Sequence, residues 1–219
     1  MTKKTQKKLR KALLLISCAA LLVCITVGVT VAYLTDDAKV TNTFSVGKVD
    51  ITMDEATVNE YGKLLDKNNK AEGEEGYDEK LVERTDGNNY KLIANHTYTK
   101  DPTITVAATS EKALLFVKVV NPLGELETDV EGKTIEDQMT ANKWYCIDGD
   151  NNIWVYGTET KATEVAANGK VVVFESFTLS DEVTNTSTAE DVVITAYAVQ
   201  ADGFEGKTPA EIWTAAFGE

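Results

Sequence analysis

The sequence contains very little cysteine, proline or histidine. Of its 219 residues, three are cysteine, three are proline and one is histidine. Cys18 and Cys24 lie in an apolar run near the N-terminus, which leaves Cys146 alone in the remainder of the chain. No intrachain disulfide can stabilise that remainder, so it has to bury a sufficient apolar core. Cys146 lies in an apolar run that starts at Trp144, which predicts a buried thiol rather than a reactive one.

The motifs of several common enzyme classes are also missing. The chain has no H-E-x-x-H, no G-x-S-x-G and no glycine-rich phosphate loop. A catalytic zinc ion usually needs at least two histidines together with a carboxylate or thiolate. The single histidine, His96, is therefore expected to be a loop or strand-end residue. The sequence predicts a protein that is not an enzyme and has no cofactor.

The first 32 residues have the pattern of an export signal. Six cations and no acid precede an apolar run from Ala12 to Val31. This run is also long enough to cross a bilayer, so a retained anchor is the alternative to a cleaved signal peptide. The small residue Ala32, with polar sequence soon after it, favours cleavage between Ala32 and Tyr33. Lipidation of a cysteine in the run is another way to anchor the chain. The sequence therefore predicts a secreted or cell-surface protein.

Cleavage would leave a strongly acidic chain. It removes six of the 22 basic residues and none of the 35 acidic ones, which changes the formal net charge from −13 to −19. Such a surface repels phosphate backbones and anionic lipid. We therefore expect no nucleic-acid partner, and membrane contact only through an uncleaved N-terminal segment. The same charge favours weak binding of divalent cations.

Strand patterns dominate residues 33–219. Thr103 to Ala107 alternates apolar and polar residues, whereas Ala113 to Val120 is apolar almost throughout. The second pattern, repeated at Asp191 to Gln200, is typical of a central strand covered on both faces. Seven or eight strands with few helices predict a single all-β domain, a jelly-roll-like β-sandwich.

Three further regions have strand signals. The first is an apolar stretch with a break at its glycine, the second a pair of runs that flank a polar turn and predict a hairpin, and the third a single valine-rich run. In that order, the three regions are Thr41 to Met53, Lys143 to Ile147 together with Ile153 to Tyr156, and Lys170 to Phe177.

Two short helices and one insertion complete the prediction. A helix is expected from Ile135 to Asn142 with Thr134 as its cap, and another near the C-terminus with Thr208 as its cap and Pro209 at its first position. Residues 66–89 are rich in charge and poor in apolar side chains. They are expected to form a mobile surface insertion.

Two N-terminal stretches resemble a known family. Val29 to Asp36 reads Val-Thr-Val-Ala-Tyr-Leu-Thr-Asp, and Asn42 to Ile51 reads Asn-Thr-Phe-Ser-Val-Gly-Lys-Val-Asp-Ile. Together they resemble the hallmark of the SipW-dependent exported proteins, the TasA and camelysin family of Gram-positive bacteria. Lys100 to Val106, followed by Ser110 and a strand, is similar to uncharacterised relatives in that group.

This resemblance implies a jelly-roll sandwich at the cell surface or in the biofilm matrix. A signal peptidase of the SipW type would cut before Tyr33, and Asn42 to Ile51 would be the first strand. Known members form matrix fibres by donor-strand complementation, in which the N-terminal strand of one subunit pairs with an open sheet edge of the next. Asn42, Phe44 and Val46 are the donor candidates here. The partners would be further copies of the chain or other matrix subunits.

Two other functions are alternatives. One is a monomeric surface module that binds polysaccharide or another ligand through Trp144, Trp154 and Tyr156, although aromatic residues in strands more often form core or cross-strand pairs. The other is a metallopeptidase of the camelysin type, since members of this family have been described as such. The lone His96 argues against a zinc peptidase.

One loop partly matches a calcium-binding template. Asp148, Asp150, Asn152 and Glu159 occupy positions 1, 3, 5 and 12 of the calcium loop. The glycine that the template requires at position 6 is replaced by Ile153, which begins an apolar run. A plain hairpin turn is therefore favoured over a calcium site.

Overall fold

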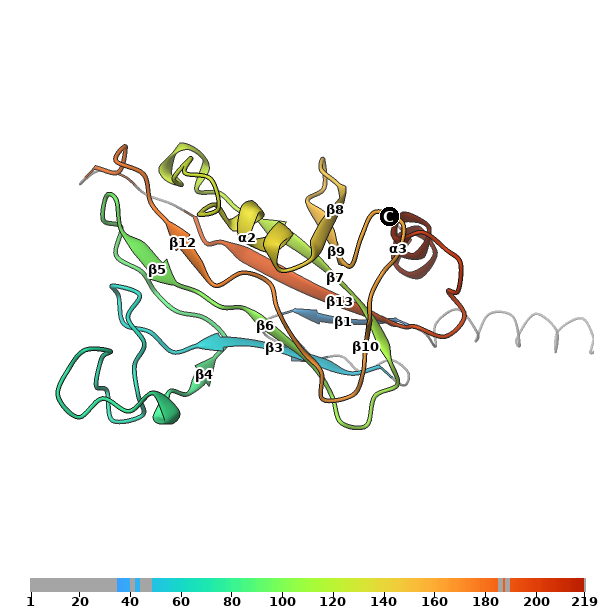
Figure 1. Cartoon of the computed structure of the whole chain (residues 1–219), viewed down its shortest axis with the longest axis horizontal. Coiled ribbons are helices and arrows are strands. Elements are labelled where there is room, and N and C mark those ends of the chain that lie inside the picture. The colour runs from blue at the N-terminus through green and yellow to red at the C-terminus, as the bar shows by residue number, and fades with distance from the viewer. Residues whose placement is uncertain (1–34, 40–41, 44–48, 185–186, 188–189, 219) are drawn as a thin grey trace, which may run out of the picture. The chain divides into compact units, whose positions relative to one another are not determined.

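The structure, a computed structural model, describes residues 35–39, 42–43, 49–184, 187 and 190–218 (Figure 1). Its largest sheet is antiparallel and has seven strands. Six follow one another in the order β2-β1-β13-β7-β9-β8, and β10 pairs with the start of β7. These strands are β1 Thr35–Lys39, β2 Asn42–Thr43, β7 Ala113–Val120, β8 Trp144–Asp148, β9 Ile153–Tyr156, β10 Glu164–Val165 and β13 Val193–Gln200.

The second layer consists of a four-stranded sheet in the order β11-β6-β3-β4 and a separate pair, β12-β5. In Figure 1, β3 and β6 run below the strands of the large sheet. The buried residues of both layers form one apolar core, so the predicted antiparallel β-sandwich is confirmed. The strands are β3 Ile51–Ala56, β4 Arg84–Thr85, β5 Thr97–Thr99, β6 Thr103–Val106, β11 Lys170–Val172 and β12 Ser176–Thr178, with short 3-10 turns at Glu79–Leu81 and Gly124–Leu126.

Strand β7 is buried on both faces over most of its length, as predicted, whereas the second face of β13 is covered only in part, with Val199 buried and Thr195 and Tyr197 half-buried. Leu115 and Val117 of β7 point into the core between the layers, whereas Leu114 and Phe116 belong to a second apolar cluster on the other side of the sheet. Helix α3 (Pro209–Phe217) covers that side, and its Trp213 ring lies 5.6 Å from the ring of Phe116. The near-continuous apolar composition of β7 follows from this double burial.

Both predicted helices are present with their predicted caps. Helix α2 (Ile135–Ala141) begins after Thr134, whose side chain accepts the backbone N–H of Asp137. Helix α3 begins after Thr208 and has a capping box with Glu211. Such caps satisfy backbone donors that the first turn of a helix leaves unpaired.

The prediction of a first strand over Asn42 to Ile51 is wrong within the described residues. The first strand is β1, Asn42 folds back to pair with Lys39, and β3 starts only at Ile51. Just before β3, the backbone N–H of Asp50 donates to the Ser110 side chain rather than to a strand. Gly47, the expected break in this stretch, lies outside the described residues. The stretch is divided because its two ends belong to different layers.

The predicted run Lys170 to Phe177 is likewise divided, between β11 and β12. Val172 pairs with Thr103 in β6, and Ser176 pairs with Thr99 in β5. Between these partner strands lies Pro102, which has no backbone N–H to continue a ladder. A proline in the partner segment therefore interrupts the run, and nothing in the run itself signals the break.

The charged residues 66–89 fold around one buried carboxylate. Asp66 is 3% exposed and accepts the backbone N–H groups of Asn68, Lys70 and Asp78 at 2.8, 3.0 and 3.3 Å. Its backbone also pairs with Val82 in an isolated bridge. The segment thus has a hydrogen-bonded conformation despite its composition, and its mobility stays a prediction.

Acid should loosen this loop. The hydrogen bond from Lys70, with those from Asn68 and Asp78, outweighs burial and lowers the pKa of Asp66 below its ordinary value of 3.8. A carboxyl group with a lowered pKa stabilises the fold fully above that ordinary value, and the contribution is lost as the pH falls through the lowered one. Hydrogen-exchange protection at the amides of Asn68 and Lys70 should therefore fall in strongly acid solution. The amides of β6 serve as the control. Equal protection of the loop in strongly acid and in neutral solution would contradict the prediction.

Candidate functional site

Strand β1 lies next to the edge of the large sheet, where the two-residue strand β2 is outermost. All five residues of β1 pair antiparallel with β13, from Thr35 opposite Val199 to Lys39 opposite Thr195. On its other side the described residues supply only the two-residue strand β2. A strand near the edge that is held by one full-length neighbour is the part of a sheet that can most readily be exchanged.

The structure describes only one of the residues predicted to take part in assembly. Asn42 lies in β2, next to β1, so it is close to the sheet edge. Phe44 and Val46 lie outside the described residues, as do Ala32 and Tyr33 at the predicted cleavage site. The donor-strand role of these residues and the cleavage stay predictions.

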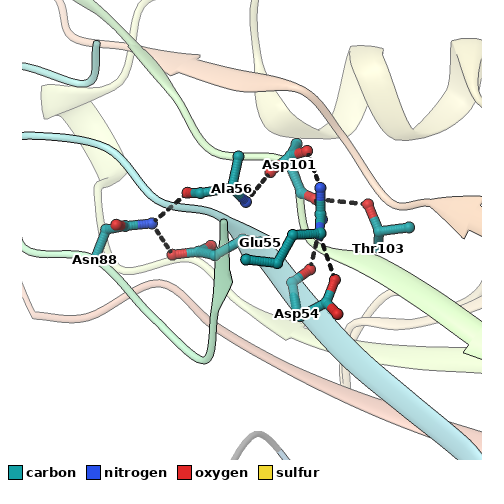
Figure 2. A network of polar contacts seen from close by, with 7 residues as sticks. Asp54, Glu55, Ala56, Asn88, Asp101 and Thr103 are labelled. Atoms are coloured by element: carbon teal, nitrogen blue, oxygen red, sulfur yellow. Dashed lines mark hydrogen bonds and ion pairs between the residues drawn. The ribbon is translucent and has the colours of Figure 1, made fainter. Parts of the chain in front are cut away.

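A polar network lies where β3 ends. Arg84 of β4 bonds the carboxylates of Asp54 and Asp101, the second at 2.8 Å, and also bonds the backbone oxygens of both residues. Asp101 in turn accepts the Ala56 N–H at 2.6 Å (Figure 2). Burial opposes the charge of Arg84, but the hydrogen bonds to Asp101 and Asp54 raise its pKa. Arg84 thus links the end of β3 to the segment that precedes β6.

Beside Arg84 lies a carboxylate that is almost fully buried. The Glu55 side chain is 5% exposed and bonds the ammonium of Lys100 at 2.6 Å and the amide of Asn88 at 2.8 Å. Sequence reasoning missed all three residues. A signal was available, because Ile51, Met53 and Glu55 share one face of β3 and the first two are core residues. An acid at a core-facing position needs partners.

These groups border a cavity of about 460 Å³. Its apolar wall includes Met53, Leu123 and Phe177, and Tyr90 also lines it. Burial first, and the negative charge of Glu55 next, raise the pKa of the Tyr90 phenol, whose hydroxyl donates to the Thr99 carbonyl. Glu55 itself is almost fully buried, whereas the cavity beside it has both apolar and acidic walls, the latter including Asp86 and Asp191.

His96 does not have the surroundings of a zinc ligand. Its Nε2 lies 2.8 Å from the Tyr61 carbonyl and therefore donates to it, and its ring packs edge-on against Tyr98. Within the described part of the chain, no three histidine, cysteine, aspartate or glutamate side chains gather as metal ligands would. Because the whole sequence has one histidine, the residues do not fit a catalytic zinc site of the usual kind.

The calcium candidates are divided between two turns. The Asp148 carboxylate accepts the backbone N–H and the side-chain amide of Asn151, and these bonds lower its pKa. Strand β9 then separates Asn152 from Glu159, which lies in the next turn. The loop with Asp148, Asp150 and Asn152 closes the predicted β8-β9 hairpin, which is confirmed. Calcium binding stays a prediction.

The aromatic candidates for ligand binding belong to the core. Trp144 and Trp154 are 2% and 7% exposed, and Tyr156 is half-buried against Trp144. This confirms the core interpretation over a carbohydrate-binding surface. Cys146 is half-buried, and burial raises the pKa of its thiol, which disfavours the reactive thiolate.

Comparison with known proteins gives one match. Residues 5–67 match the camelysin metallo-endopeptidase family, which confirms the predicted resemblance to the TasA and camelysin family. The matched stretch contains β1, β2 and β3, so it includes the near-edge strand β1 that pairs with β13. Neither the curated proteins nor the solved structures provided a match. None of the helices in the described residues is both long and apolar enough to span a membrane.

Proposed function

We propose that the protein is an exported structural subunit of the cell surface or extracellular matrix, which forms fibres by exchanging β1 between copies. The observation that carries the proposal is the place of β1, the first strand of the described residues, along the side of β13 that faces away from β7. The backbone pairing of β1 can be supplied equally by the β1 of a neighbouring copy.

The chemistry of the N-terminus supports this assembly. A cut before Tyr33 would leave two residues in front of β1 and remove six positive charges. The strand would then be free to leave its own sheet. Each copy would donate one strand and accept another, and a head-to-tail contact of that kind does not close, so it generates filaments.

Cross-linking in register tests strand exchange. Lys39 and Thr195 are replaced by cysteine in a chain that carries Cys146→Ser, and filaments are treated with a short thiol cross-linker. If β1 is exchanged, denaturing gels should show a ladder of multimers. The control pair, Lys118 and Thr195 in β7 and β13, should give cross-linked monomers only. Filaments in which the β1 pair also gives monomers alone would contradict strand exchange.

Electron microscopy tests assembly itself. Residues 33–219 should form filaments, and a chain without residues 33–47 should not, because β1 and β2 are then absent. A mature chain that stays monomeric at high concentration, with and without calcium, would contradict the proposal.

The family description favours one other candidate, a metallo-endopeptidase. Under the structural proposal, purified residues 33–219 should not cleave casein. Cleavage that a chelator abolishes and zinc restores would establish the enzymatic alternative. A His96→Ala variant is the matched control, since His96 is the chain's sole imidazole.

A further inference from the structure

Lys100, Glu55 and Asn88 form an arrangement that goes beyond an ion pair. The two oxygens of the Glu55 carboxylate are shared between its partners: Oε2 lies 2.6 Å from Lys100 Nζ, and Oε1 accepts from Asn88 Nδ2 at 2.8 Å. An amine and a carboxamide thus meet at one carboxylate. Figure 2 shows the Asn88 amide aimed at Glu55 and at the carbonyl of Ala56.

The Asn88 amide is held by three hydrogen bonds. Its Nδ2 donates to Glu55 and to the Ala56 carbonyl, and its Oδ1 accepts the Val58 N–H at 3.0 Å. A backbone N–H needs an acceptor and a carbonyl needs a donor, so these contacts fix which end of the amide is oxygen. The Val58 N–H is therefore aimed at the oxygen that would become negative if the amide carbon were attacked.

The site is shielded, and it has an exit. The side chains of Glu55 and Lys100 are 5% and 11% exposed, and the aromatic rings of Tyr90 and Phe177 line the same cavity as all three polar residues. The 2.6 Å contact between Nζ and Oε2 gives a proton a direct path from the amine to the carboxylate. The cavity of about 460 Å³ gives a small leaving molecule a way out.

We propose that Lys100 and Asn88 become joined by an intramolecular isopeptide bond, with Glu55 as the proton carrier. Glu55 takes a proton from Lys100, and the neutral Nζ attacks Cγ of Asn88. Negative charge develops on Oδ1, where the Val58 N–H stabilises it. The Cγ–Nδ2 bond then breaks.

The reaction balances without a metal, oxidant or second substrate. Glu55 passes two protons in succession from Nζ to the departing Nδ2, which leaves as ammonium, and Glu55 ends as the carboxylate it was at the start. One Nζ–Cγ bond replaces one Cγ–Nδ2 bond. The chain loses one ammonia.

The cross-link would join two segments on either side of β3 at one end of the sandwich. Asn88 follows β4, Lys100 connects β5 to β6, and Glu55 lies in β3 between them. An isopeptide bond here would hold the end of the charged loop to the sheet whatever the redox conditions. Residues 33–219, which contain a single cysteine, would gain a covalent constraint other than a disulfide.

Mass spectrometry of the folded, purified chain tests the proposal. The intact mass should be lower than the sequence mass by one ammonia. Trypsin should give one branched peptide, residues 85–91 joined to residues 92–112, because a modified Lys100 is no longer a cleavage site. Peptides 85–91, 92–100 and 101–112, recovered separately and in full yield from the folded chain, would mean an ion pair only and overturn the proposal.

Two variants connect the bond to the proposed chemistry. Glu55→Gln should restore the full mass and the three separate peptides, because glutamine cannot carry the protons. Glu164→Gln, at the exposed pair with Lys112, should leave the branched peptide unchanged. A branched peptide that persists in Glu55→Gln would overturn the role of Glu55. Ammonia loss located at Asn168-Gly169, where a succinimide can form, would overturn the assignment to Lys100.

Discussion

Replacing Glu55 by glutamine should lower the free energy of unfolding by about 3–5 kcal/mol, the usual cost of removing one partner of a buried ion pair. In this variant the Lys100 ammonium, whose side chain is 11% exposed, would have no counter-ion. Guanidinium denaturation followed by circular dichroism measures the loss. The same variant should also lack the proposed isopeptide bond. The peptide map detects the loss of the bond, and denaturation measures the loss of stability.

A matched pair on the surface provides the control for this prediction. Lys112 and Glu164 lie 2.8 Å apart, but their side chains are 64% and 54% exposed. Glu164→Gln should therefore cost less than about 1 kcal/mol. The double variant Glu55→Leu, Lys100→Met should be more stable than Glu55→Gln, because it leaves no buried charge without a partner. Equal losses of unfolding free energy in Glu55→Gln and Glu164→Gln would show that Glu55 is hydrated in solution.

The Trp144→Ala variant should lose about 3–5 kcal/mol of unfolding free energy. Trp144 is 2% exposed, packs against Tyr156, and donates its indole N–H to the Val172 carbonyl at 2.9 Å. It therefore connects β8 in the large sheet with β11 in the other layer. Alanine would leave a cavity in the core and an unpaired carbonyl at the same time.

The adjacent Tyr145 is the control, because it is 38% exposed on the same strand. Tyr145→Ala should change the stability by no more than about 0.5 kcal/mol. Guanidinium denaturation measures the unfolding free energy of both variants. A Trp144→Ala chain of unchanged stability would contradict the core assignment and bring back a ligand-binding role for this residue.

The parts of the fold that are determined locally could be predicted from the sequence. β7 is apolar on both faces because each face meets a separate cluster, so composition alone revealed its central position. The caps at Thr134 and Thr208 are encoded within four residues of their helices. The hairpin between β8 and β9 has a polar turn between two apolar runs. In each case the interacting groups are close in the sequence.

The parts determined by distant residues could not be predicted. The break between β11 and β12 depends on Pro102, which belongs to the neighbouring segment. The site around Glu55 joins residues that are 33 and 45 positions away from it, and single-sequence patterns do not pair such residues. The composition of residues 66–89 does not distinguish Asp66 from the other charged residues, although Asp66 is buried and accepts three backbone N–H groups. The charge content of a segment is a poor guide to the exposure of one of its carboxylates when several backbone N–H groups hydrogen-bond that carboxylate.

The pairing of β1 with β13 has a consequence for the order of events during synthesis. Thr35 is made early but finds its partner, Val199, only when nearly the whole chain has emerged. Contacts between the two ends of a chain form slowly, because a long loop has to close first. Until then β1 has no partner in its own chain, and under the proposed strand exchange the β13 of a second chain would compete for it. Under that proposal, the relative rates of pairing within one chain and between two chains decide whether a chain joins a neighbour, and a high local concentration favours pairing between chains.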